Sequence, residues 1–202
     1  MTTPRIVYTD SLSSRDSLTD RHTMQKNTQH HHSSTKPQEK KDERPPFIRQ
    51  MHDLPADEPW RYDEGGEEFA TRRRISRALG FERIGVHLDT IPPGHRSSLP
   101  HAEELEEEMI LVVEGTPHAW IDGVLHELGP GDVVVFEPGT GITHTIINSS
   151  DADVKVLVIG DHVPENRYIY PLNPERRGKV PDESWWEDWP ERAFGDASPE
   201  PK

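Results

Sequence analysis

The segment from residue 81 to 160 is made of short runs rich in Val, Ile, Leu and aromatic residues, and each run ends at a turn signal. In the first run, residues 84–89, every second residue is Ile, Val or Leu, and Pro92-Pro93-Gly94 then ends the pattern. Six more runs follow: residues 109–113, 118–121, 124–128, 132–136, 143–148 and 154–159. No long helical pattern separates them, and Asp122-Gly123 is a strong signal for a tight hairpin. The sequence therefore predicts an antiparallel β-barrel or sandwich.

Apolar residues are scarce outside this segment. Hydrophobic residues make up 31% of the 202 residues, against roughly 45–50% in a typical globular protein. The first 46 residues are mostly polar, and such a composition cannot bury enough apolar area to offset the entropy lost on ordering. We predict four parts: a disordered polar tail (1–46), an N-terminal arm (47–80), a β-barrel (81–161) and a C-terminal arm (162–202). Within the N-terminal arm, residues 68–79 are predicted to form a short helix or an extended lead-in.

The C-terminal arm is rich in Pro and charged residues, but it also contains Trp185, Trp186 and Trp189. Three indole rings in five positions are costly to leave in water, at roughly 25 cal/mol per Å² of apolar surface. The sequence therefore predicts that this segment is docked. We expect it to pack on the outer face of the barrel or on a second subunit; the alternative is a lid over the mouth of the barrel.

The composition disfavours several classes of protein. The chain has no Cys, which excludes disulfides, thiolate nucleophiles and Cys-rich zinc sites. Its formal net charge of -14 repels polyanions, so we expect no nucleic-acid partner. There is no signal-peptide pattern and no apolar run of about 18 residues, so the sequence favours a soluble, cytoplasmic protein with no membrane partner.

Potential metal ligands gather near the start and near the end of the barrel segment. His101 and Glu103 are two residues apart, so their side chains point the same way in an extended segment. Glu108 begins an apolar run and His144 lies within another, so both are directed at buried surface, where a carboxylate needs a cation, a hydrogen bond or a proton. A divalent metal satisfies all these groups, because imidazole and carboxylate are good ligands for Fe, Mn, Ni or Zn. The predicted ligand set is His101, Glu108 and His144.

These two stretches resemble the two sequence motifs of the cupin superfamily, whose small barrels hold a divalent metal inside. The matching residues are Gly94, His101, Glu108 and Gly115 in the first motif, and Gly131, Pro138, Gly141, His144 and Asn148 in the second. The resemblance covers residues 81–161. It implies an all-β fold, a double-stranded β-helix or jelly-roll barrel. It also implies a divalent metal cofactor, with Fe or Mn favoured over Zn or Ni, and a homodimer.

One position departs from the family pattern. Glu103 stands where the first cupin motif has its second His. Glu103 is either a fourth metal ligand or a general base beside a three-residue site that leaves open metal positions. Two His and one carboxylate form the triad of many non-haem iron oxygenases. A third alternative is that the barrel holds no metal and that these residues fill a polar pocket.

The acidic stretch around these ligands is unusual. Five of the six residues 103–108 are Glu, and like charges this close raise one another's pKa unless a cation intervenes. We interpret Glu104 and Glu106 as solvated members of an acidic loop. Glu107 is kept as a backup ligand in case the register of the loop differs by one residue.

The remaining His residues are predicted to have no ligand role. His87, His118 and His126 fall on predicted strands and are interpreted as surface or hydrogen-bonded residues. His30-His31-His32 could chelate a metal, but its place in the polar tail favours no specific function.

The sequence leads to three hypotheses about function. The first is a divalent-metal-dependent enzyme, dioxygenase-like, that acts on a small oxygen-rich organic molecule, with Glu103 as a ligand or as the catalytic base. Metal-dependent isomerases, lyases and decarboxylases resemble it equally and are kept as alternatives. The second is a non-catalytic cupin that binds or senses a small molecule in the same pocket. The third, a storage or structural cupin, is disfavoured because such proteins usually need no ligand cluster.

Overall fold

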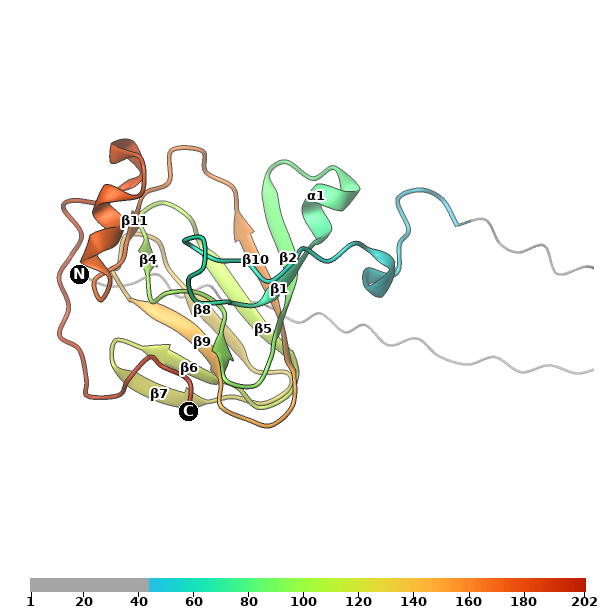
Figure 1. Cartoon of the computed structure of the whole chain (residues 1–202). Coiled ribbons are helices and arrows are strands. Elements are labelled where there is room, and N and C mark those ends of the chain that lie inside the picture. Colours follow the sequence, from blue (N-terminus) through green and yellow to red (C-terminus); the bar gives the residue numbers. More distant parts are fainter. Residues whose placement is uncertain (1–43) are drawn as a thin grey trace, which may run out of the picture. The chain divides into compact units, whose positions relative to one another are not determined.

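The computed structural model describes residues 44–202 (Figure 1). The predicted disordered tail lies outside the described residues except for its last three positions, and so does His30-His31-His32. The described part has eleven strands and one helix, α1 (Ile75–Leu79). Short 3₁₀ turns lie at Met51–Asp53, Pro174–Gly178 and Asp182–Ser184. The predicted all-β fold is confirmed.

Most strands belong to two antiparallel sheets that face each other as a double-stranded β-helix (Figure 1). The larger sheet has the order β1 (Thr71–Arg74), β2 (Ile84–Ile91), β10 (Val154–Asp161), β5 (Glu108–Glu114), β8 (Val133–Phe136). The smaller sheet has the order β3 (His95–Arg96), β9 (His144–Asn148), β6 (His118–Ile121), β7 (Val124–Glu127). A separate short pair joins β4 (Ala102–Glu103) to β11 (Tyr168–Ile169). Each of the seven predicted runs is a strand, with ends that differ by a few residues.

The hydrophobic core lies between the two sheets. Its members are Ala70, Ile91, Ile110, Val112, Ala119, Phe136, Ile146, Val154, Val156 and Val158. On β10 the three core Val residues alternate with side chains that face outward, as the period of a strand requires. The inner face of β2 is different, because His87 lies in the same row across the sheet as Val158 and Ile110. The barrel interior therefore has an apolar end and a polar end.

The end of the N-terminal arm forms both of the alternatives predicted for residues 68–79. Strand β1 pairs with β2, and α1 follows directly. The helix ends at Gly80, whose φ of 75° is the left-handed conformation common at helix C-termini. The register places Arg72 opposite Asp89. The sequence did not predict this strand pairing, which brings a guanidinium group to the polar end of the barrel.

The C-terminal arm packs against the end of the barrel near β4 and β11 (Figure 1). Trp185 and Trp186 are buried in a second apolar cluster, together with Phe69, Leu99, Ala102, Ile169 and Tyr170. Further along the arm, the indole N–H of Trp120 on β6 donates to the carbonyl of Ala197 at 2.7 Å. Trp185 and Trp186 do not line the cavity of the barrel. The Trp residues are therefore docked, as their apolar surface predicted, while Tyr168 and Tyr170 of the same arm line the cavity.

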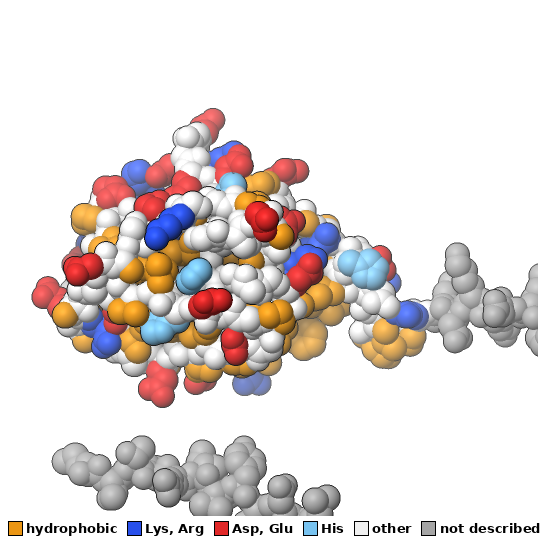
Figure 2. Space-filling view, turned by 90° about the horizontal axis from the view of Figure 1, so that it is seen from below, with side chains coloured by type: hydrophobic (Ala, Val, Ile, Leu, Met, Phe, Trp, Pro, Cys, Tyr) orange, Lys and Arg blue, Asp and Glu red, His pale blue; other side chains and the backbone are white. Residues whose placement is uncertain are grey.

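The surface of the described part is strongly acidic and contains some exposed apolar groups. Acidic side chains are spread over the face shown in Figure 2, in keeping with the net charge of -14 for the chain. Val113, Val133 and Val135 are exposed on the neighbouring strands β5 and β8. No helix within residues 44–202 is long and apolar enough to cross a membrane.

The turn after β5 gives a prediction about stability. Gly115 has a φ of 88°, and a Cβ atom there would lie 2.7 Å from Val154 Cγ2 and 3.1 Å from Val154 Cα. Gly115→Ala is therefore expected to destabilise the domain by about 1–3 kcal/mol, measured by urea unfolding. Gly131→Ala is the matched control, because Gly131 has a φ of 95° but open space around it. Equal losses for the two variants would show that the contact with Val154 costs nothing.

Candidate metal and small-molecule site

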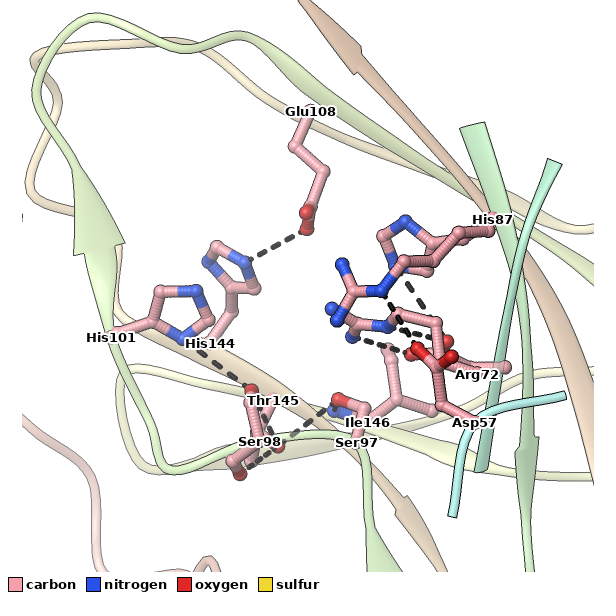
Figure 3. Close-up of polar contacts among 12 residues, drawn as sticks. Asp57, Arg72, His87, Ser97, Ser98, His101, Glu108, His144, Thr145 and Ile146 are labelled. Atoms are coloured by element: carbon pink, nitrogen blue, oxygen red, sulfur yellow. Dashed lines mark hydrogen bonds and ion pairs between the residues drawn. The ribbon is translucent and has the colours of Figure 1, made fainter. Parts of the chain in front are cut away.

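The polar end of the barrel contains a cavity of about 420 Å³, within the range of roughly 300–1,000 Å³ found for small-molecule sites. All four predicted site residues line it: His101, Glu103, Glu108 and His144. They lie at or beside the starts of β4, β5 and β9. Figure 3 shows three of them, His101, Glu108 and His144, on one side of the cavity. The fold thus brings together residues that the sequence places far apart.

Backbone pairing holds the two His residues side by side. The N–H of His101 donates to the carbonyl of His144 at 3.2 Å, and the reverse bond measures 3.0 Å. The two ring centroids are 5.1 Å apart. Phe136 of β8 stacks on the ring of His144, with centroids 3.5 Å apart, so this imidazole has little freedom to turn.

Each imidazole faces a carboxyl group with its Nε2 atom. The distance from His144 Nε2 to Glu108 Oε1 is 3.2 Å, and the distance from His101 Nε2 to Glu103 Oε1 is 3.9 Å. The Nδ1 atoms lie near backbone carbonyl oxygens, at 2.9 Å for His101 and 3.2 Å for His144. Because a carbonyl oxygen can only accept, we infer that Nδ1 carries a proton in both rings. His144 Nε2 can then face Glu108 in two ways: it donates a second proton to the carboxylate, or it presents a lone pair to a cation that lies between the two groups.

Burial and neighbouring charges set different pKa values for the two carboxyl groups. Burial, reinforced by repulsion from Glu108, raises the pKa of Glu103 to about 9. Burial also acts to raise the pKa of Glu108, but the hydrogen bond and attraction to His144 outweigh it and hold this pKa below its ordinary value. Burial lowers the pKa of His101 to about 4. At neutral pH, Glu103 is thus protonated, Glu108 is ionised and His101 is uncharged.

The donor groups fit a divalent metal in kind. An imidazole lone pair that faces a carboxylate calls for a cation or a proton between them. The 3.2 Å between His144 and Glu108 is near the ~3.0 Å expected for two ligands at right angles around a metal with bonds of about 2.1 Å. Across residues 44–202, no group of three or more His, Asp or Glu side chains converges closely enough to hold a metal ion as the side chains stand. A third ligand would have to join by side-chain rotation.

The other side of the cavity carries a charged cluster that the sequence did not predict (Figure 3). Arg72 donates two hydrogen bonds to Asp89, from Nε at 2.9 Å and from Nη2 at 2.8 Å. Asp89 is fully buried. His87 Nε2 lies 3.6 Å from Asp89 Oδ1 and is buried without a hydrogen-bond partner. Burial lowers the pKa of His87 to about 4, so the ring is neutral at pH 7.

The interpretation of His87 as a surface or hydrogen-bonded residue is wrong. The alternation in residues 84–89 identifies two faces of a strand, and here the polar face is the one that points into the barrel. Asp89 on the same face was the available signal, because a buried carboxylate needs a partner. His118 and His126 do not line the cavity.

The acidic stretch also turns further inward than predicted. Glu106 was expected to be solvated, but it lines the cavity and accepts a hydrogen bond from the backbone N–H of Val163 at 2.8 Å. Glu104 forms an ion pair with Arg167 of the C-terminal arm. Glu107 also lines the cavity. The cause is the pairing of β4 with β11, which draws this loop against the C-terminal arm.

Aromatic rings complete the wall of the cavity. These are Trp60, Tyr62, Tyr168 and Tyr170. Trp60 stacks on Phe69, with centroids 4.8 Å apart, and the Arg72 guanidinium lies 5.6 Å from the Trp60 ring centroid. Burial raises the pKa of Tyr168 to about 12, so its hydroxyl group stays protonated. The N-terminal and C-terminal arms thus supply the apolar part of a site whose polar part comes from the barrel.

The structure is thus a jelly-roll barrel with imidazole, carboxyl and aromatic groups around an internal cavity. Residues 87–160 match the family model described as Cupin domain. The barrel segment of this chain is thus a cupin domain, as its two motifs predicted. A comparison with curated proteins found no match.

Several solved structures are similar to this chain. A sugar phosphate isomerase from Silicibacter pomeroyi is 32% identical, with a TM-score of 0.49, over 50% of this chain and 64% of its own. A putative sugar phosphate isomerase from Acidithiobacillus ferrooxidans is 28% identical, with a TM-score of 0.50, over 52% of this chain and 66% of its own. The polyketide cyclase RemF from Streptomyces resistomycificus is 22% identical, with a TM-score of 0.50, over 68% of this chain and 94% of its own. The chain therefore spans slightly less than two thirds of the two isomerase structures.

Proposed function

We propose that this chain is a divalent-metal-dependent enzyme that acts on a small oxygen-rich organic molecule inside the barrel. The main support is the placement of His101, Glu108 and His144 on one cavity, with His144 Nε2 3.2 Å from Glu108 Oε1. These three residues would hold the metal, Fe or Mn in preference to Zn or Ni, because the two-His-one-carboxylate set suits non-haem Fe(II). The bound metal would supply a Lewis acid and a template for a substrate oxygen.

Glu103 has a different proposed role from the three ligands. Its distance of 3.9 Å from His101 is longer than the 3.2 Å that separates Glu108 from His144. It also lies opposite Tyr168 in the β4–β11 pair, at the wall of the cavity. We propose that Glu103 exchanges a proton with the substrate as a general acid or base, with service as a fourth metal ligand as the alternative.

Three reaction classes are compatible with such a site. Oxygenase chemistry is the first, because it commonly uses two His and one carboxylate with open metal positions. An isomerase or lyase reaction is the second. It is supported by a carboxyl group placed for proton transfer and by the likeness to the Acidithiobacillus ferrooxidans structure, which is named as a putative sugar phosphate isomerase. A decarboxylase is compatible with the same site.

Metal content is the first test of this proposal. The full-length chain, purified without chelators and without nickel columns, is expected to contain about one divalent metal ion per chain, measured by inductively coupled plasma mass spectrometry. The His30-His31-His32 sequence is replaced by Ala in a parallel preparation, so that metal bound by that segment is counted separately. Protein without stoichiometric metal in both preparations would refute the metal-dependent enzyme.

A second measurement separates the reaction classes. Oxygen consumption by the Fe(II)-loaded protein with catechols or diketones would identify oxygenase chemistry. Exchange of substrate C–H hydrogen in deuterated water, followed by NMR, would identify an isomerase or lyase that moves a proton through Glu103. Tight binding of a small molecule without either change would instead support the non-catalytic binding or sensor protein.

The homodimer implied by the family resemblance remains a prediction. The exposed Val113, Val133 and Val135 on the outer face of β5 and β8 offer apolar surface to a second copy.

A further inference from the structure

The charges on the cavity wall bear on what kind of molecule can enter it. Two guanidinium groups reach the cavity, and both are already paired with a carboxylate. Arg72 is bound to Asp89 through two hydrogen bonds, and Arg74 Nε donates to Asp57 at 2.7 Å. Five other carboxyl groups line the cavity: Glu103, Glu106, Glu107, Glu108 and Asp161. Glu103 is protonated at neutral pH, but one divalent cation would offset only part of the charge of the other four groups, so a phosphate or carboxylate group on the ligand would be repelled.

The hydrogen-bonding groups of the cavity further limit the class of ligand that can bind there. The wall presents acceptors, the carboxylates, and also donors, namely the hydroxyl groups of Ser97 and Ser98 and the N–H groups that Arg72 does not use on Asp89. An ammonium group has no acceptor for these donors, and an ionised phosphate or carboxylate group has no donor for the carboxylates. A hydroxyl group both donates and accepts. A molecule with several hydroxyl groups matches this wall.

His87 is placed to bind such a molecule. Its Nε2 lies 3.6 Å from Asp89 Oδ1 and has no hydrogen-bond partner, and the ring lines the cavity, so a hydroxyl group of a ligand can supply a hydrogen bond that the ring lacks. His87 and Arg72 lie across the cavity from His101, Glu108 and His144 (Figure 3). A small molecule between the two sides would contact both. The aromatic rings of Trp60 and Tyr62 add flat apolar surface suited to the C–H face of a sugar ring.

We propose that the cavity binds a neutral polyhydroxylated molecule, an unphosphorylated sugar or related polyol, and that His87 binds one of its hydroxyl groups. The proposal rests on the proposed function in that the ligand shares the cavity with the metal site. It differs from the phosphorylated substrate class in the name of the Acidithiobacillus ferrooxidans structure, because the guanidinium groups of Arg72 and Arg74 are already paired.

The test is a set of matched binding measurements on the full-length chain. Isothermal titration calorimetry is run with D-glucose, D-fructose and D-ribose and with D-glucose 6-phosphate, D-fructose 6-phosphate and D-ribose 5-phosphate, each with Mn(II)-loaded and metal-free protein. At least one neutral sugar is expected to bind about tenfold or more tightly than its phosphate. A phosphate that binds as tightly as the neutral sugar, or no binding by any of the six, would overturn the proposal.

Two variants test the residues involved. His87→Ala is expected to weaken binding of the neutral sugar about tenfold, as for the loss of one buried hydrogen bond. His118→Ala, on β6 and away from the cavity, is the control and should bind as the wild type does. Glu106→Gln removes one wall charge and is expected to reduce the preference for the neutral sugar about threefold. Unchanged sugar affinity in His87→Ala would remove His87 from the site.

The outcomes separate this proposal from the proposed function. A preference for neutral sugars in a chain that never contains metal would support the ligand class and refute the metal-dependent enzyme. A stoichiometric metal together with tighter binding of the phosphates would support the metal-dependent enzyme and refute the neutral sugar as its ligand.

Discussion

Arg72→Ala is expected to destabilise the folded domain by about 3–5 kcal/mol, the cost of leaving a buried charge without its partner. Asp89 is fully buried, and Arg72 provides both of its charged hydrogen bonds. Without the guanidinium, Asp89 must either keep an unpaired charge in the barrel or take up a proton. Urea unfolding followed by circular dichroism measures the loss of free energy.

Two control variants test whether the loss of stability comes from the burial of the Asp89 charge. Arg74→Ala removes a neighbouring guanidinium whose ion pair with Asp57 is exposed, and it is expected to cost only about 0–1 kcal/mol. The double variant Arg72→Leu, Asp89→Leu removes both charges and should recover much of the stability lost in Arg72→Ala. If Arg72→Ala and Arg74→Ala have the same effect, the buried pair does not hold the β1–β2 contact in place.

The second large effect concerns metal affinity. Glu108→Ala and His144→Ala are each expected to weaken Mn(II) binding by about 100-fold or more, because each removes one of three proposed ligands. Calorimetry with Mn(II) and metal content after purification measure the loss. Glu103→Ala discriminates between the two proposed roles of Glu103. If Glu103 is a metal ligand, its loss lowers the Mn(II) affinity to a similar extent. If it transfers a proton, its loss lowers turnover and leaves most of the Mn(II) affinity intact.

The matched control for these variants is Glu114→Ala. Glu114 lies at the other end of β5 and forms an exposed pair with Lys155, so its loss should change neither metal affinity nor metal content. Thermal unfolding of each variant shows whether it is folded. If the folded Glu108→Ala and His144→Ala proteins bind Mn(II) as tightly as the wild type, the proposed metal site is wrong.

The strands could be predicted because their signal is local. Alternation with a period of two and the turn residues between runs depend only on neighbouring positions, and all seven runs are strands. The Asp122-Gly123 hairpin follows from the same kind of information: Asp122 has a φ of 45° and Gly123 a φ of 83°, as a tight hairpin turn requires. The family motifs added the barrel closure that alternation alone leaves open.

The sequence predicted the residues on only one side of the cavity. His101, Glu103, Glu108 and His144 stood out because ligand types on apolar strands are unusual. Arg72 and His87 did not, because an Arg before a short helix and a His on an alternating strand are common on surfaces. Their place in the cavity depends on the pairing of β1 with β2, which is a contact between segments and has no local signal.

The sequence by itself determined the strands, the turns, the family and the residues that face the barrel from β4, β5 and β9, because strand period and ligand chemistry are properties of neighbouring residues. Only the tertiary structure decided which face of β2 is inside and which charges are paired. It also decided how the two arms close the cavity with aromatic rings. The physical reason is that a buried charge is tolerable only beside its partner, and the partner of Asp89 comes from a strand whose pairing exists only in the folded chain.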